Sequence, residues 1–86
     1  MYKNKADDGR NNICGQNIRF FRQQLSPAVS QRALADLMQL HGVDLDKNAI
    51  QRIESGQRFV TDIELRQFAK VLQVSYSDLL DKKHNV

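Results

Sequence analysis

One helix-start signal recurs four times in this chain, and it constrains the fold more than any other feature of the sequence. In each copy an apolar residue precedes a Ser, Thr or Asp, and a second apolar residue follows about one helical turn later. The apolar pairs are Val29 with Leu34, Leu45 with Ile50, Val60 with Leu65, and Val74 with Leu79. Such pairs form the hydrophobic staple of a helix whose polar residue caps the first turn. Glu64 and Asp78 add the acid of a capping box to the last two copies.

These signals predict four helices: Gln31 to about His41, residues 46–55, Asp62 to about Gln73, and Tyr76 to about Asp81. Another helix precedes them, because the apolar residues Cys14, Ile18, Phe21 and Leu25 follow helical spacing from about Ile13. That helix must end before Pro27, which restricts the residue ahead of it. Gly42 and Gly56 stand where a left-handed residue closes a helix. No strand is needed, so we expect an all-α fold with five helices.

The length of 86 residues predicts a single domain. We expect a mobile N-terminal arm over residues 1–12, which are polar and without periodicity, then one domain over 13–81 and a short tail over 82–86. No apolar run is long enough for a membrane span, and the N-terminus has no secretory signal. With a single cysteine no internal disulfide can form, so a reducing, cytoplasmic setting is expected.

The helix over residues 46–55 has two chemically different faces. Ala49, Ile50 and Ile53 gather on one side, which needs a core to pack against. The opposite side carries Lys47, Asn48, Gln51 and Arg52. These side chains offer many hydrogen-bond donors and few acceptors, which suits the phosphates and base edges of a nucleic acid. The net charge of +3 is compatible with such a partner but does not establish it.

Nothing in the sequence favours catalysis or a cofactor. His41 and His84 are too isolated to make a metal site, which needs several converging ligands. Cys14 lies on an apolar helix stripe, where a small core residue is expected rather than a nucleophile. The serines lack a base at useful spacing, and there is no glycine-rich phosphate loop. We therefore expect a protein that is no enzyme and that carries no metal.

The segment from Gly15 to Leu80 resembles the phage-repressor-type, or XRE, helix-turn-helix family. The resemblance is carried by Ser30-Gln31, Leu34-Ala35, Ile50, Arg52-Ile53-Glu54, Gly56, Arg58, Leu65, Ala69, Leu72, Val74-Ser75 and Leu79-Leu80. It implies the five-helix lambda-repressor-like fold and sequence-specific binding of double-stranded DNA by a transcriptional repressor. It also implies a homodimer on a two-fold DNA site, with no small-molecule effector evident.

The resemblance also implies roles for individual residues. The base-facing positions of the recognition helix are Lys47, Asn48, Gln51 and Arg52. Gln31, at the start of its helix, and Arg58, just after the recognition helix, match phosphate-binding positions. Arg22 and Glu54 match a structural ion pair that joins the first and third helices. Losing one partner of such a buried pair costs about 3–5 kcal/mol.

The chain departs from the family pattern in one important way. The turn between the second and third helices is lengthened by about five residues, which we place around Leu40 to Asp44. The tilt of the recognition helix therefore does not follow from the resemblance. Leu37 and Leu40 either fill the space made by this longer turn or belong to a dimer contact.

Several alternatives stay open at this stage. Arg22 and Glu54 could be two solvated charges, and the face with Lys47, Asn48, Gln51 and Arg52 could be an ordinary solvated helix face. The same fold could serve as a protein-interaction module, such as an antitoxin or adaptor, without specific DNA recognition. The N-terminal arm could contact the DNA backbone or could be an ordinary frayed terminus. Arg19 and Arg32 could bind phosphates or could only aid solubility.

Overall fold

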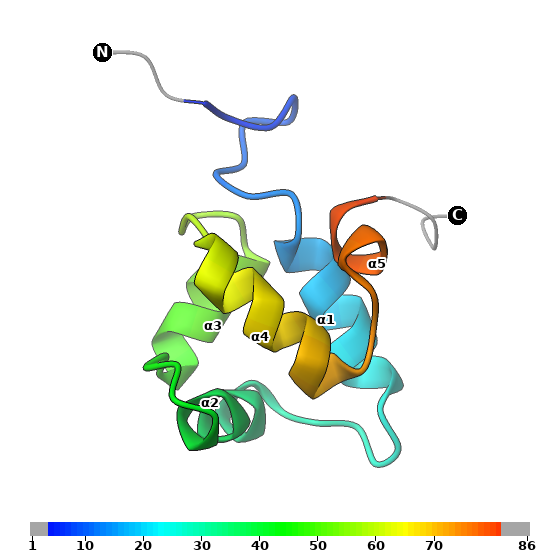
Figure 1. Cartoon of the computed structure of the whole chain (residues 1–86). Helices are drawn as coiled ribbons and strands as arrows, with labels where there is room; N and C mark the ends of the chain where they lie inside the picture. The colour runs from blue at the N-terminus through cyan, green and yellow to red at the C-terminus, as the bar shows by residue number, and fades with distance from the viewer. Residues whose placement is uncertain (1–3, 82–86) are drawn as a thin grey trace.

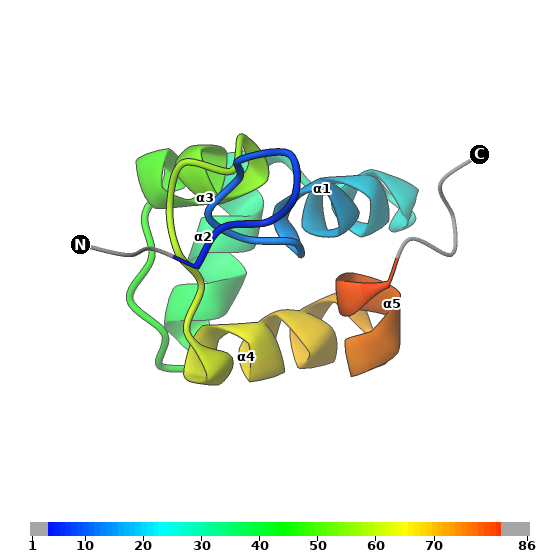
Figure 2. The ribbon, with the colours of Figure 1, turned by 90° about the horizontal axis from the view of Figure 1, so that it is seen from above.

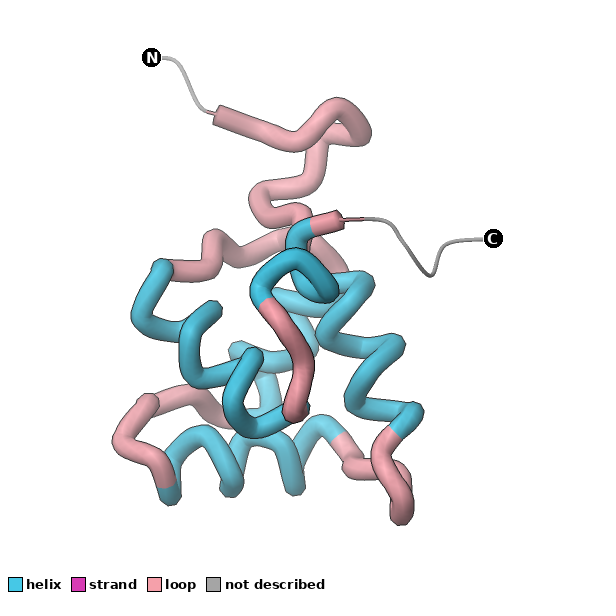
Figure 3. The backbone as a smooth tube through the Cα atoms, turned by 45° about the vertical axis from the view of Figure 1, so that its right-hand side comes forward, coloured by secondary structure: helices cyan, strands magenta, loops and turns pink. Residues whose placement is uncertain are grey.

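The computed structural model describes residues 4–81, and this part of the chain is helical without any strand (Figures 1 and 3). Its helices are α1 (Gly15–Gln24), α2 (Gln31–Leu40), α3 (Lys47–Glu54), α4 (Asp62–Leu72) and α5 (Tyr76–Leu80). The all-α expectation is therefore confirmed for residues 4–81. None of the helices in this range is long and apolar enough to cross a membrane. The predicted tail over 82–86, with His84, lies outside the described residues, as do residues 1–3 of the predicted arm.

The four predicted helix starts are all present. Each of the caps accepts a hydrogen bond from the third N–H of its helix, and the capping residues are Ser30, Asp46, Thr61 and Ser75. The capping boxes with Glu64 and Asp78 are complete in both directions. Local sequence thus determines where α2 to α5 begin, because each first turn carries its own hydrogen-bond acceptor.

The predicted helix ends are correct to within a residue or so. α2 stops at Leu40, and Gly42 then takes a φ of 85°. α3 is followed by Gly56 at a φ of 84°, a conformation in which a side chain would be strained. α4 ends at Leu72, because Gln73 adopts the left-handed conformation with a φ of 61°. A non-glycine residue there had no signal in the sequence.

The core lies where the five helices meet. Its fully buried side chains come from every helix and from the connection before α3: Ile18, Leu34, Met38, Leu45, Ile50, Ile53, Phe68 and Leu79. α3 packs against both α1 and α2, while α4 crosses α1 and α2 and is joined by α5 (Figures 1 and 2). The apolar face of α3 is therefore held by two neighbouring helices, and its opposite face is left at the surface.

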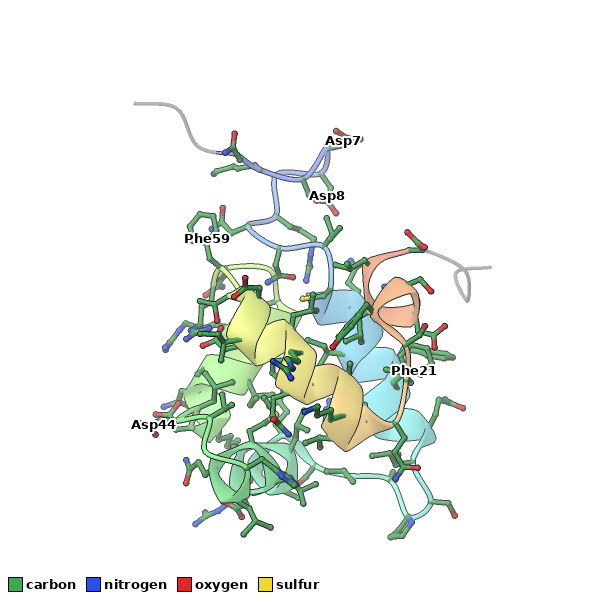
Figure 4. The ribbon with its side chains drawn as sticks, viewed as in Figure 1. Asp7, Asp8, Phe21, Asp44 and Phe59 are labelled. Atoms are coloured by element: carbon green, nitrogen blue, oxygen red, sulfur yellow. The ribbon has the colours of Figure 1, made fainter. Side chains whose placement is uncertain are left out.

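The connection between α2 and α3 is long, as the sequence predicted, and it is fastened at both ends. The Val43 N–H donates to the carbonyl of Met38 at 2.9 Å, and the side-chain amide of Gln39 donates to the carbonyl of Leu45 at 2.9 Å. Leu45 fills the core, whereas Asp44 points outward (Figure 4). Leu40 is 77% exposed, so the interpretation that it fills space in the longer turn is wrong.

Candidate nucleic-acid interface

The exposed face of α3 carries the four side chains that the sequence singled out. Lys47, Asn48, Gln51 and Arg52 are all exposed, and their side chains make no hydrogen bond or ion pair within residues 4–81. On the other side of the same helix, Ala49, Ile50 and Ile53 are buried. The helix thus offers a continuous row of free donors on a rigid support.

The start of this helix is locked by its cap. The Asp46 carboxylate accepts a hydrogen bond of 2.7 Å from the Ala49 N–H. Because the Asp46 carboxylate caps the helix N-terminus, it does not accept hydrogen bonds from the donors further along the exposed face. A carboxylate at a helix N-terminus is also stabilised by the helix dipole.

Arg22 and Glu54 form the ion pair that was expected between the first and third helices. The guanidinium Nε lies 2.8 Å from Glu54 Oε2, and Nη2 lies 3.0 Å from Oε1. Both side chains are buried, at 10% and 4% exposure. The remaining Nη1 of Arg22 donates to the carbonyl of Val29 at 2.9 Å, which ties the loop before α2 to the same group. This acid therefore belongs to the scaffold and does not face a ligand.

Gln31 does not stand free as a phosphate-binding side chain. Its amide Nε2 donates to Glu54 Oε1 at 3.0 Å, which completes a network from α1 through α3 to the start of α2. The physical reason is that the Glu54 carboxylate is buried and gains a third donor in this way. What α2 can still offer to an anion is the backbone N–H groups of its first turn.

Arg58, which the resemblance matches to a phosphate-binding position, is also paired within the protein. Its Nη1 and Nη2 donate to the two carboxylate oxygens of Glu64 at 2.9 Å each. The pairing raises the pKa of Arg58 and, through the same hydrogen bonds, lowers the pKa of Glu64. Glu64 is fixed nearby by its capping-box role, so it is a ready acceptor for Arg58. The next residue, Phe59, projects outward from the loop between α3 and α4 (Figure 4).

The last three residues of the predicted mobile arm are hydrogen-bonded to the end of α3 and to the turn that follows it. Arg10 Nη2 donates to the Glu54 carbonyl at 2.6 Å. The Asn11 N–H donates to the Gly56 carbonyl at 2.8 Å, and the Asn11 side-chain amide donates to the Gln57 carbonyl at 2.9 Å. Figure 2 shows this segment passing over α3 before it enters α1.

Asn12 joins three parts of the fold. Its Oδ1 accepts a hydrogen bond of 2.8 Å from the Gly15 N–H at the start of α1. Its Nδ2 donates to the carbonyls of Ile53 and Arg58, at 3.0 and 2.7 Å. An asparagine just before an apolar helical stripe is typical of a helix cap, so the contact to α1 had a visible signal. The contacts to the end of α3 had none.

The remaining candidates stay at the margin of this interface. Arg19, Arg32 and His41 are exposed, and their side chains have no partner within residues 4–81. Cys14 is buried, and its burial raises the pKa of the thiol to about 11. The thiol therefore stays protonated at neutral pH. Among residues 4–81 no cluster of three His, Cys, Asp or Glu residues is placed to hold a metal ion.

Comparisons of this chain with protein-family models, with curated proteins and with solved structures find no match.

Proposed function

We propose that this protein binds double-stranded DNA in a sequence-specific way and acts as a transcriptional regulator, most simply a repressor. In this proposal α2 and α3 form a helix-turn-helix of the lambda-repressor-like type with a lengthened turn. One observation carries the proposal: α3 has four free donor-bearing side chains on its exposed face while its other face is fully packed. We place its action in the cytoplasm, where Cys14 would stay reduced.

The chemistry of the exposed row matches the edges of base pairs. The amides of Asn48 and Gln51 can each donate to and accept from adenine in the major groove, while Lys47 and Arg52 can donate to the two acceptors of guanine. The major groove is wide enough to admit a helix such as α3. The backbone N–H groups at the start of α2, with the exposed Arg32 beside them, suit a neighbouring phosphate.

The protein is proposed to act as a homodimer on a two-fold DNA site, since one recognition helix reads only a few base pairs. Ile63, which is 71% exposed, lines a hollow of about 560 Å³ together with Leu65, Tyr76 and Leu80. A two-fold interface is self-complementary, so one copy's Ile63 can enter the hollow of the other. Asp62 and Arg66 border the same hollow and can pair across the two-fold axis.

A second candidate function is a protein-interaction module, because the exposed apolar residues of α4 and α5 could instead receive another protein. The two candidates predict different surfaces. An interaction module would use the apolar face of α4 and α5 and would leave the polar row of α3 without a role. DNA binding requires the polar row, and it predicts that charge-removing substitutions there reduce binding.

Selection from a labelled pool of random duplexes at two salt concentrations tests the proposal. We expect enrichment of a two-fold sequence whose half-site spacing reports the dimer geometry. Affinity should fall steeply as salt rises, because each phosphate contact releases counterions. No enrichment, together with an affinity for duplex DNA that does not change with salt, would contradict DNA binding. Binding that enriches no sequence would contradict the specific role of α3.

A further inference from the structure

We propose, on the basis of the DNA-binding function above, that Arg10 and Asn12 are positioning residues for α3. They hold the C-terminal end of this helix against the start of α1 and thereby set which base pairs Gln51 and Arg52 can reach. Neither residue faces the DNA in this proposal. Their effect on specificity passes through the orientation of the helix.

The two ends of α3 are held by different parts of the chain. The first turn is fixed by the Asp46 cap and by the buried staple of Leu45 and Ile50. The last turn leaves backbone carbonyls that have no partner within the helix. Two of them, those of Ile53 and Glu54, receive side-chain donors from the segment before α1.

The donors are of the kind that a helix C-terminus favours. The cationic Arg10 lies at the negative end of the helix dipole, where a positive charge is stabilising. The amide of Asn12 bonds the Ile53 carbonyl at 3.0 Å and, in the following loop, the Arg58 carbonyl at 2.7 Å. Because its oxygen also accepts from Gly15, this one side chain fixes the end of α3 relative to the start of α1.

The backbones of α1 and α3 are closely packed at this junction. A Cβ atom on Gly15 would collide with the Ile53 carbonyl oxygen, so α1 and α3 meet here through their backbones. A Cβ atom on Gly56 would lie 2.7 Å from the Arg10 guanidinium carbon, so the arginine lies flat over the turn that ends α3. When Arg10 or Asn12 is loosened, the backbone at the end of α3 loses these donors, and the side-chain pair of Glu54 with Arg22 is the hold that remains there.

The consequence differs along the helix. If the C-terminal end loosens while the capped first turn stays in place, displacement grows with distance from that turn. Lys47 and Asn48 lie near the fixed end, while Gln51 and Arg52 lie a turn further along. Base recognition by Gln51 and Arg52 should therefore depend on the contacts of Arg10 and Asn12 with the end of α3. Base recognition by Lys47 and Asn48 should not.

Asn12→Asp is the sharpest variant, because it keeps the size of the side chain and the acceptor for Gly15 but replaces the donor to Ile53 and Arg58 with a carboxylate oxygen that both carbonyls repel. Affinity is measured for the selected duplex and for each of its single-base-pair variants. We expect discrimination at the base pairs that Arg52→Ala affects to fall roughly 3- to 10-fold. Discrimination at the base pairs that Lys47→Ala affects should change less than about twofold.

Ser75→Ala is the matched control, since it removes the cap of α5 and lowers stability while leaving every hydrogen bond of this junction in place. It should reduce the fraction of folded protein and leave every discrimination ratio unchanged. Arg10→Ala, which removes a single bond to α3, should reproduce the Asn12→Asp pattern more weakly. Uniform losses across all positions in the Asn12→Asp protein, or no loss, would overturn the proposal.

Amide hydrogen exchange tests the same point without DNA. In the Asn12→Asp protein the N–H groups of Ser55, Gly56 and Gln57 should exchange about tenfold faster, while that of Ile50 should be unchanged. Equal protection at both ends of α3 would overturn the positioning role. If wild-type protein discriminates among no duplexes while exchange changes as expected, the proposed DNA-binding function fails and the structural coupling stands.

Discussion

Arg22 and Glu54 face each other in the interior as a two-pronged ion pair, with nitrogen–oxygen distances of 2.8 and 3.0 Å. The pair joins α1 to the last residue of α3, and Gln31 adds a further donor to the same carboxylate. Nε and Nη2 of Arg22 and the Gln31 amide all donate to this carboxylate, while Nη1 of Arg22 donates to the Val29 carbonyl. The pair therefore braces α3 and keeps its acid in the interior, away from the exposed face.

Removing one partner of this pair should be strongly destabilising. Arg22→Met leaves the Glu54 carboxylate buried without its main donor, and we expect a loss of about 3–5 kcal/mol in the free energy of unfolding. The double variant Arg22→Met with Glu54→Leu should recover much of that loss, because no buried charge is left unpaired. Urea unfolding followed by circular dichroism measures both. Additive losses in the double variant would show that the two side chains do not act as a pair.

The cap of α3 should contribute measurably to stability. Asp46→Ala removes the acceptor for the Ala49 N–H, and we expect it to cost about 1 kcal/mol. Asp44→Ala is the matched control: the residue is an exposed aspartate in the same connection, without a side-chain partner among residues 4–81, so its loss should stay within about 0.5 kcal/mol. Thermal unfolding of the two variants makes the comparison. Equal effects would contradict a specific capping role for Asp46.

Stability should fall in acid partly through Glu64. The hydrogen bonds from Arg58 lower the pKa of Glu64 in the folded protein. The ion pair's contribution to the free energy of unfolding is therefore fully present above the unfolded pKa of about 4.3, and it is lost as the pH drops through the lower pKa of the folded state. Glu64→Gln keeps an amide suited to the capping box but removes the charge, so it should be less stable than wild type near pH 7, by at most about 1 kcal/mol. The difference should shrink toward pH 3. Asp62→Asn is the control for the loss of a nearby charge. A stability difference between Glu64→Gln and wild type that does not change with pH would argue against the ion pair.

The apolar hollow between α4 and α5 should control self-association. Ile63→Glu places a charge where one copy would enter the other, and we expect it to raise the dimer dissociation constant at least tenfold. Sedimentation equilibrium measures this constant, with Leu40→Glu as the control on an exposed apolar residue of α2. If Leu40→Glu disrupts the dimer and Ile63→Glu does not, the interface lies on α2.

The helix boundaries could be predicted from the sequence because their causes are local. Ser30, Asp46, Thr61 and Ser75 each act within the first turn that follows them, so short segments contain the whole signal. Buried and exposed faces were predictable for the same reason, since the helical period places Ile50 and Ile53 on one side.

The contacts that support the candidate site were harder to predict. Arg10 and Asn12 bind backbone carbonyls more than forty positions away in the chain, and carbonyls are the same in every residue. Arg58 was predicted to contact a phosphate, and its guanidinium pairs with Glu64, which lies six positions further along the chain and already had a role in the capping box. Such competition between a predicted ligand and an internal acceptor is decided only by tertiary geometry.

The central claim is that the exposed side chains of α3 recognise base pairs, and one measurement tests this claim most directly. Affinities of wild-type protein, Gln51→Ala, Arg52→Ala and the control Lys70→Ala, which removes an exposed charge from α4, are measured for the selected duplex and for a scrambled duplex of equal composition. We predict that Gln51→Ala and Arg52→Ala each lower the ratio of the two affinities by about 5- to 150-fold, corresponding to about 1–3 kcal/mol per base contact, and that Lys70→Ala leaves it unchanged. A ratio that stays at the wild-type value in both α3 variants would contradict base readout by this helix.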